Sequence, residues 1–264
     1  MTLPALVATD LDGTLLRSDG TLSARTRDAM VALEAAGVHV VIVTARPPRW
    51  MHEFEGLLGR HGVALCANGA FVYHVAERRM LAAHTLPAEL VRRLATVLRA
   101  ELPGTVFAVE TAEGFDREPD YVDPYPPLAG MRVAPLEELL SHPPGKLLAR
   151  NEQLAPDVFL ARAGDLVGAD AVLAYSGADG LAEISAPGVT KAAALADWCA
   201  RLGVEADKVW TFGDMPNDLS MLDWAGRGHA VANAHPDVLA AADTICASND
   251  DDGVARTLEA ALGR

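Results

Sequence analysis

The stretch VATDLDGTLLRS, residues 7–18, carries an apolar segment straight into two aspartates. Residues 4–9 have the pattern of a buried strand, so Asp10 and Asp12 come where that strand leaves the core. Two carboxylates this close repel each other unless water or a cation lies between them. A solvated turn explains the stretch equally well when it is taken alone, because Asp and Gly favour turns. The rest of the chain has to decide between a turn and an acidic site.

The segments that follow predict a parallel sheet. Residues 23–37, SARTRDAMVALEAAG, predict a helix with Ser23 as its N-cap and Gly37 just beyond its end. Residues 38–45, VHVVIVTA, form a near-continuous β-branched run, which is typical of a strand buried on both faces. Strand, helix and strand in this order imply a right-handed crossover and parallel pairing. The last third of the chain repeats the alternation of helices and strands.

The middle of the chain has a different pattern. Helix and strand signals alternate around residues 117–130, REPDYVDPYPPLAG, a stretch rich in Pro and Asp that predicts an irregular loop. Two helices, each followed by strands, indicate an α+β unit of its own. We therefore predict an α/β protein: a Rossmann-like core with a parallel sheet and helices on both faces, at residues 1–81 and 188–264, and an inserted α+β cap at residues 82–187.

Composition and charge narrow the class of protein. The formal net charge is −14, which argues against nucleic acid as the main partner because binding to phosphate backbones needs clustered Lys and Arg. Apolar runs stay shorter than a membrane span, and the N-terminus lacks the basic start of a secretory signal. Only 3 cysteines occur, which fits a reducing compartment. We expect a cytoplasmic protein without membrane partners, and the sequence is silent on its oligomeric state.

Polar residues stand at the ends of the predicted elements of the larger unit. Thr44 ends a strand, Lys191 opens a helix, and GDMPND, residues 213–218, follows another strand. Each has an ordinary explanation when taken alone: Thr44 can pack in a turn, Asn217 or Asp218 can cap a helix, and Lys191 can be solvated. In an open parallel sheet, however, ligands bind beyond the carboxyl ends of the strands, so we expect these residues to converge with the aspartates of the opening stretch.

The converging residue types point to phosphoryl chemistry. Asp10, Asp12 and Asp214 are hard oxygen donors, which suit Mg²⁺ better than softer metals. Lys191 and Thr44 have the charge and the hydroxyl to bind oxygens of a phosphoryl group. One aspartate can attack phosphorus, and the other can give a proton to the leaving alkoxide and later take one from water.

Four motifs, taken together, resemble those of the haloacid dehalogenase-like superfamily of phosphohydrolases. They are DLDGTLL, VTAR, GVTK and GDMPNDLSML. The long insert before the lysine, with CANGA before it and SNDDDGVARTLE near the C-terminus, is similar to the Cof-type branch. The resemblance covers the whole chain and is weakest through the cap. It implies a phosphatase that uses Mg²⁺ and acts on a small phosphorylated metabolite.

The resemblance also implies roles for single residues. It makes Asp10 the nucleophile and a metal ligand, and Asp12 the general acid/base with its backbone carbonyl on the metal. The remaining expected site residues are Thr44, Ala45, Arg46, Asn68, Lys191 and Asn217 for substrate or phosphate, and Asp214 and Asp218 for the metal. The motif commonly has glycine where Ala45 stands, so a turn that needs positive φ would be strained here. Arg46 is equally compatible with substrate binding, cap contact and solvation.

The cap sequence does not name a substrate. Candidate residues are Tyr121, Tyr125, Arg132, Lys146 and Glu183, each of which also has a structural explanation. Sugar phosphates and phosphorylated cofactors such as pyridoxal phosphate or flavin mononucleotide remain open. The alternatives to a phosphatase are a phosphotransferase or phosphomutase on the same site, and a non-catalytic protein that binds a phosphorylated ligand. The presence of both Asp10 and Asp12 argues against the last, and a dehalogenase fits the motifs less well.

Overall fold

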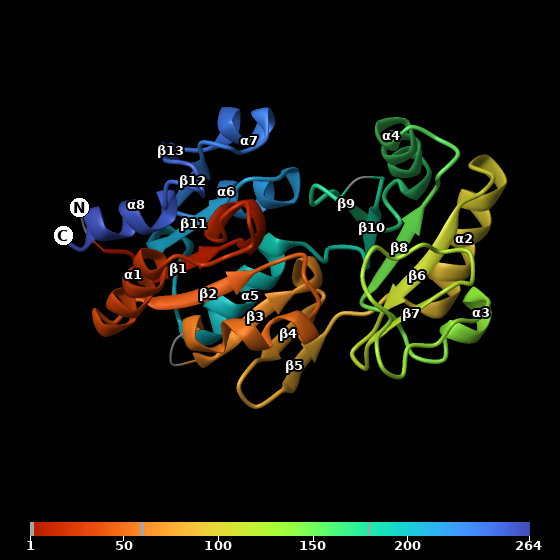
Figure 1. The fold of residues 1–264 in the computed structure, drawn as a ribbon, viewed down its shortest axis with the longest axis horizontal. Helices are drawn as coiled ribbons and strands as arrows, with labels where there is room; N and C mark the ends of the chain where they lie inside the picture. Colours follow the sequence, from red (N-terminus) through yellow and green to blue (C-terminus); the bar gives the residue numbers. More distant parts are fainter. Residues whose placement is uncertain (1–2, 59–60, 179) are drawn as a thin grey trace. The chain divides into compact units, whose positions relative to one another are not determined.

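The computed structural model describes residues 3–58, 61–178 and 180–264. The chain forms two compact units. The first contains the residues up to Ala82 together with those from Thr190 onward, and the second is the continuous segment Ala83–Val189. The second unit is therefore an insertion into the first, as the colours along the chain show in Figure 1.

The first unit is built on a mixed sheet. Its strands lie in the order β13 (Thr244–Cys246), β12 (Arg227–Val231), β11 (Val209–Gly213), β1 (Leu6–Thr9), β2 (His39–Val43), β3 (Val63–Cys66), β4 (Phe71–His74) and β5 (Arg79–Ala83). Pairing is parallel from β13 to β3, and β4 runs antiparallel to β3. The strands β1, β2 and β11 are almost wholly buried, as their apolar runs predict.

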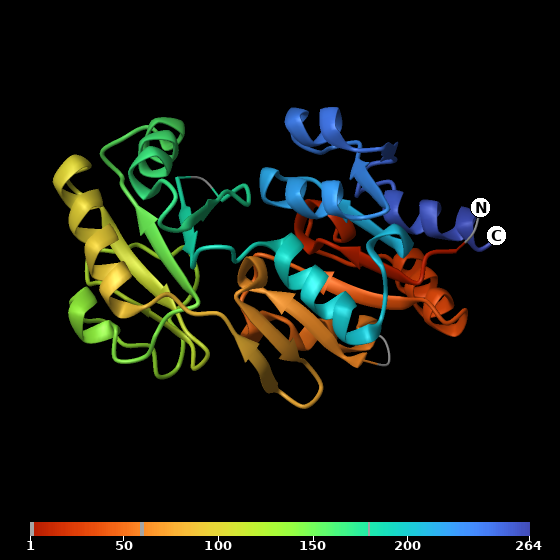
Figure 2. The same ribbon diagram turned by 180° about the vertical axis from the view of Figure 1, so that it is seen from behind.

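Helices cover both faces of this sheet. The helices α1 (Ala24–Ala35) and α8 (Gly253–Ala261) lie on one face, and α5 (Lys191–Leu202) and α6 (Leu219–Trp224) on the other (Figures 1 and 2). The short helix α7 (Pro236–Ala241) follows β12. The hydroxyls of Ser23 and Thr190 accept from backbone N–H groups in the first turns of α1 and α5, which fixes where these two helices begin.

The second unit has a sheet of its own. Its strands lie in the order β7 (Phe115–Arg117), β6 (Val106–Glu110), β8 (Lys146–Arg150), β10 (Ala182–Ser185) and β9 (Val172–Ala174), and neighbours pair antiparallel. One face packs against α2 (Ala88–Glu101), α3 (Leu136–Leu139) and α4 (Pro156–Val167). Leu94, Phe107 and Phe159 belong to the apolar core between sheet and helices.

The predicted fold class is confirmed: a mainly parallel sheet with helices on both faces, plus an inserted α+β unit. Among the helices of the described residues, none combines the length and the apolar character that a membrane crossing requires.

Candidate active site

The expected site residues of the first unit follow neighbouring strands. Asp10 comes directly after β1, Thr44 after β2 and Asp214 after β11, while Asn68 lies in the turn after β3. These four strands are adjacent and parallel. Their carboxyl ends therefore share one edge of the sheet, which is where open α/β sheets bind ligands.

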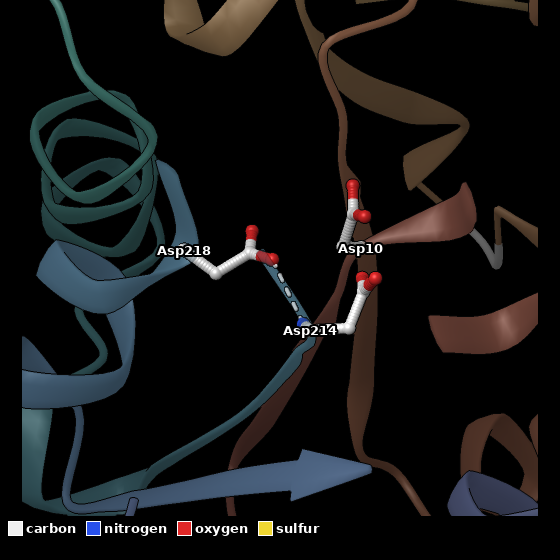
Figure 3. Close-up of side chains that lie close together, drawn as sticks. All are labelled: Asp10, Asp214 and Asp218. Atoms are coloured by element: carbon white, nitrogen blue, oxygen red, sulfur yellow. Dashed lines mark hydrogen bonds between the residues drawn. The ribbon is translucent and has the colours of Figure 1, made fainter. Parts of the chain in front are cut away.

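Three buried carboxylates meet at this edge. Oxygens of Asp10, Asp214 and Asp218 all lie within 4.8 Å of one another, and Figure 3 shows the side chains turned toward a common space. The exposed fractions of the three residues are 6%, 6% and 0%. Such a cluster of hard oxygen donors is the kind of set that a cation such as Mg²⁺ binds.

Lys191 is the cation that this cluster contains. Its Nζ donates to Oδ1 of Asp10 at 2.8 Å and to Oδ1 of Asp218 at 2.6 Å, and the residue is 1% exposed. Burial alone lowers the pKa of Lys191, but the two carboxylates outweigh burial and raise the pKa above its ordinary value. The ammonium group thus stays charged at the first position of α5, where the helix dipole disfavours a cation.

Burial and mutual repulsion disfavour the ionised form of Asp10 and Asp214. Burial raises the pKa of Asp10 well above its ordinary value, against the pull of Lys191, and the charges of Asp218 and Asp214 raise it further. Burial and the neighbouring Asp218 raise the pKa of Asp214 to about 6, against the lowering effect of the hydrogen bond from Thr14. A cation between these groups would relieve both burial and repulsion.

Backbone geometry places the acidic side chains. Oδ2 of Asp218 accepts from the N–H groups of Asp214 and Met215, each at 3.0 Å. The hydroxyl of Thr14 donates to Oδ1 of Asp214 at 2.7 Å, which links the first motif to the last. Sequence reasoning did not single out Thr14, although it stands in the opening stretch directly after the turn glycine.

Thr44, Asn68 and Asn217 form the polar side of the edge. Thr44 is fully buried, and its hydroxyl accepts from the N–H of Arg46 at 3.0 Å. Nδ2 of Asn217 donates to Oδ1 of Asn68 at 3.1 Å, while Oδ1 of Asn217 meets no donor within the described residues. Asn68 has φ +57° and Ala67 before it has φ +51°, left-handed values that cost free energy in non-glycine residues.

Asp12 does not join the three buried carboxylates. Its side chain is 55% exposed and forms a two-pronged pair with Arg46, whose Nε and Nη2 donate at 2.8 and 2.7 Å. The Arg46 guanidinium also lies over the ring of Phe54 at 5.3 Å and approaches Glu53 at 3.4 Å. Of the roles that the sequence left open for Arg46, free solvation is therefore not the one found.

Ala45 fits its turn without left-handed strain. The non-glycine residues with positive φ in the described ranges are Ala67, Asn68, Arg78 and Asp252, and Ala45 is not one of them. The turn after Thr44 thus does not need the glycine that the resembling motif commonly has.

The residues that the sequence singled out in the second unit have local partners. Nζ of Lys146 donates to Glu183 at 2.6 Å, and both residues are buried. Arg132 binds the carboxylate of Asp116 through its Nε and Nη2. Burial raises the pKa of Tyr121 to about 12.

The chain is similar to known proteins over most of its length. A family model described as haloacid dehalogenase-like hydrolase matches residues 7–258. The 5-amino-6-(5-phospho-D-ribitylamino)uracil phosphatase YitU of Bacillus subtilis is 29% identical, over 98% of this chain and 97% of its own. The pyridoxal phosphate phosphatase YbhA of Escherichia coli is 28% identical, over 95% of this chain and 96% of its own.

A solved structure shares the fold over nearly its whole length. BT1666 from Bacteroides thetaiotaomicron, from a study of phosphatases of the haloalkanoate (HAD) enzyme superfamily, superposes with a TM-score of 0.82 and 22% identity. The match covers 98% of this chain and 96% of that one.

Proposed function

Because the chain belongs to the haloacid dehalogenase-like hydrolases, of the Cof type, we propose that it is a Mg²⁺-dependent phosphatase that acts through an aspartyl-phosphate intermediate on Asp10. The observation that carries this proposal is the buried meeting of three carboxylates and one lysine at the carboxyl edge of a parallel sheet. Carboxylates and a fixed ammonium group are the partners that a metal-assisted phosphoryl transfer needs.

The donor set fits a magnesium ion. The clustered atoms of Asp10, Asp214 and Asp218 are all carboxylate oxygens, and no His or Cys belongs to this cluster in the described part of the chain. Burial and then the neighbouring carboxylates raise the pKa values of Asp10 and Asp214, and a bound cation would offset both effects. We assign these three carboxylates and the backbone carbonyl of Asp12 to the metal. When bound, Mg²⁺ would neutralise the carboxylates and draw electron density from the phosphoryl oxygens.

Two aspartates carry out the chemical steps of the proposed reaction. Asp10 attacks phosphorus and forms the acyl phosphate, while the bond from phosphorus to the ester oxygen breaks. Asp12 gives a proton to the leaving alkoxide and then takes one from the water that attacks the aspartyl phosphate. The second step releases inorganic phosphate and restores Asp10. The pair with Arg46 fixes the direction of the Asp12 side chain.

The remaining edge residues would hold the phosphoryl group. Lys191 supplies a positive charge. Thr44 supplies a hydroxyl whose oxygen accepts from the N–H of Arg46 and whose proton has no acceptor within the described residues. Asn217, Asn68 and the turn at Ala45 and Arg46 complete the set that we assign to substrate.

We propose a small phosphomonoester as the substrate, either a sugar phosphate or a phosphorylated cofactor. Two relatives are named for phosphorylated heterocycles, a ribitylaminouracil phosphate and pyridoxal phosphate. We assign residues 82–187 as the cap domain that chooses among such esters.

Release of inorganic phosphate from a panel of phosphomonoesters tests the proposal. We expect turnover with Mg²⁺ and loss of turnover with EDTA or in Asp10→Asn. Asp19→Asn is the matched control, because Asp19 is an exposed aspartate on a nearby turn and should leave turnover unchanged. A folded wild type that releases phosphate from none of the esters in Mg²⁺ would overturn the proposal. Phosphate transfer only in the presence of a second sugar would assign the site to a transferase.

A further inference from the structure

The motif SNDDDG near the C-terminus, which the proposed mechanism does not use, lies against the first acidic motif. We call residues 248–252 the C-terminal strap. Within it, Nδ2 of Asn249 donates to the carbonyl of Leu16 at 2.9 Å, and Asn249 is 4% exposed. Asp250 accepts from both N and Oγ of Ser18 at 2.8 Å, and Asp252 pairs with Arg17 at 3.0 Å. The strap therefore binds three consecutive residues of the N-terminal loop.

One asparagine continues this contact to the acidic site. The backbone N–H of Asn249 donates to Oδ1 of Asn233 at 2.9 Å, and Nδ2 of Asn233 donates to the carbonyl of Gly13 at 2.7 Å. Gly13 follows Asp12 directly and has φ +74°. A Cβ on Gly13 would lie 2.4 Å from Oδ2 of Asp214, so the backbone here passes very close to the clustered carboxylates. A small shift of Gly13 would therefore displace Asp12, its neighbour in the chain, and crowd Asp214.

The loop that carries Asn233 also binds the other acidic segment. The backbone N–H of His235 donates to the carbonyl of Asp214 at 2.8 Å. Asn233 thus binds the carbonyl of Gly13, after β1, and His235 binds the carbonyl of Asp214, after β11. Both ends of the Asn233 amide are used, one toward the strap and one toward Gly13.

We propose that Asn233 is a positioning residue for the first acidic motif, and that the backbone N–H of Asn249 orients its side chain. The hydrogen bond to the Gly13 carbonyl holds the turn Leu11–Leu15. This turn presents Asp12 and Thr14, and Thr14 in turn orients Asp214. The role rests on the proposed phosphatase function, because the groups being positioned are those assigned to the reaction.

Asn233→Asp and Asn233→Ala test this role. Both remove the donor to Gly13, and the alanine variant adds no charge, so a shared effect reports the lost hydrogen bond. We expect kcat to fall about tenfold with KM changed less than about twofold, because a small misplacement of reacting groups costs rate. Asn233 is exposed, so both variants should fold. Arg17→Gln, which breaks the pair between Arg17 and the strap but leaves Gly13 bound, is the matched control and should keep kcat within about twofold.

Hydrogen exchange gives a readout besides activity. The peptide that spans residues 11–18 should exchange faster in both Asn233 variants than in wild type, because the hydrogen bond to the Gly13 carbonyl is lost. Asn249→Ala keeps the backbone N–H that binds Asn233 and loses only the side-chain hydrogen bond to the Leu16 carbonyl, so exchange should rise less than in the Asn233 variants. Wild-type kcat in folded Asn233→Ala, with unchanged exchange in this peptide, would overturn the positioning role. A wild type without phosphatase activity would instead contradict the proposed function, so the two failures are distinct.

Discussion

His229 is a buried histidine that packs against aromatic rings. It lies in β12 at 1% exposure, and its ring stacks on Phe212 with centroids 4.5 Å apart and planes 11° from parallel. Neither ring nitrogen has a hydrogen-bond partner in the described ranges. Burial lowers the pKa of His229 to about 4, and the charge of Arg227 adds to the lowering against the opposite effect of Asp243.

This histidine should make stability depend on pH. In the unfolded chain, His229 takes up a proton below about pH 6.5. In the folded chain, it stays neutral down to about pH 4. The free energy of unfolding should therefore fall as pH falls through this window, by up to about 1.4 kcal/mol per pH unit, with no penalty above it.

His229→Phe isolates the effect, because it removes the titrating group and keeps the stacking. Between pH 7.5 and pH 5, wild type should lose about 2 kcal/mol more than the variant in urea unfolding. His84→Phe changes an exposed histidine and serves as the control. Equal pH dependence in wild type and His229→Phe would contradict the assignment.

Single residues also show where sequence reasoning stops. The sequence predicts Lys191 in the first turn of a helix, where a lysine is commonly solvated. The structure buries it between Asp10 and Asp218, which lie 181 and 27 residues away along the chain. Asp12 and Arg46 likewise pair across 34 residues. Which strand ends meet follows from local patterns, but which side chains pair depends on packing that no local pattern encodes.

At the scale of elements, segments with clear caps or apolar runs were predictable, and some short strands were not. The helix caps at Ser23 and Thr190 and the β-branched run of β2 give clear signals. The strands β3 and β4 are short, and sequence reasoning did not identify them. The turn between them, residues 67–69, takes three successive positive φ values of 51°, 57° and 99°.

Gly69 should be indispensable in that turn. A Cβ there would lie 2.5 Å from the carbonyl oxygen of Thr190 and 2.8 Å from Cβ of Ala194, at φ +99°. Gly69→Ala should therefore lower the free energy of unfolding by about 3 kcal/mol, from left-handed strain and overpacking against α5. Chemical denaturation of wild type and Gly69→Ala would measure this loss in the free energy of unfolding.

Gly20→Ala is the matched control for that measurement. Gly20 also has positive φ, +78°, but a Cβ there would meet nothing within 4 Å. It should cost only the backbone term of about 1–2 kcal/mol. Equal losses in the two variants would show that contact with α5 does not constrain the turn.

At the scale of the whole molecule, two units carry separate cores. The second unit is a single continuous segment whose helices and sheet enclose Leu94, Phe107 and Phe159. The first unit is made from two segments that are far apart in the chain. The change of pattern in the middle of the sequence indicates an insertion, and the structure shows why: helices there pack on an antiparallel sheet rather than between parallel strands.

We expect residues 83–189 to fold when produced alone. The fragment should show a cooperative thermal transition by circular dichroism, because its apolar core is internal. Phe159→Ala should destabilise the fragment by about 3–5 kcal/mol, since this side chain is fully buried. Its neighbour Val158 is 44% exposed, and Val158→Ala should cost far less. A fragment without a cooperative transition would show that the unit depends on the rest of the chain.

The strand order has a consequence for synthesis on the ribosome. β1 pairs with β2 on one side and with β11 on the other, and β11 begins only at Val209. Translation proceeds at about 5–20 residues per second, so one edge of β1 stays unpaired for roughly 10–40 s until β11 is synthesised. An unpaired apolar edge is a template for association with other chains, so the nascent N-terminal half is the form that chaperones must protect. The inserted unit, in contrast, is complete before translation reaches β11.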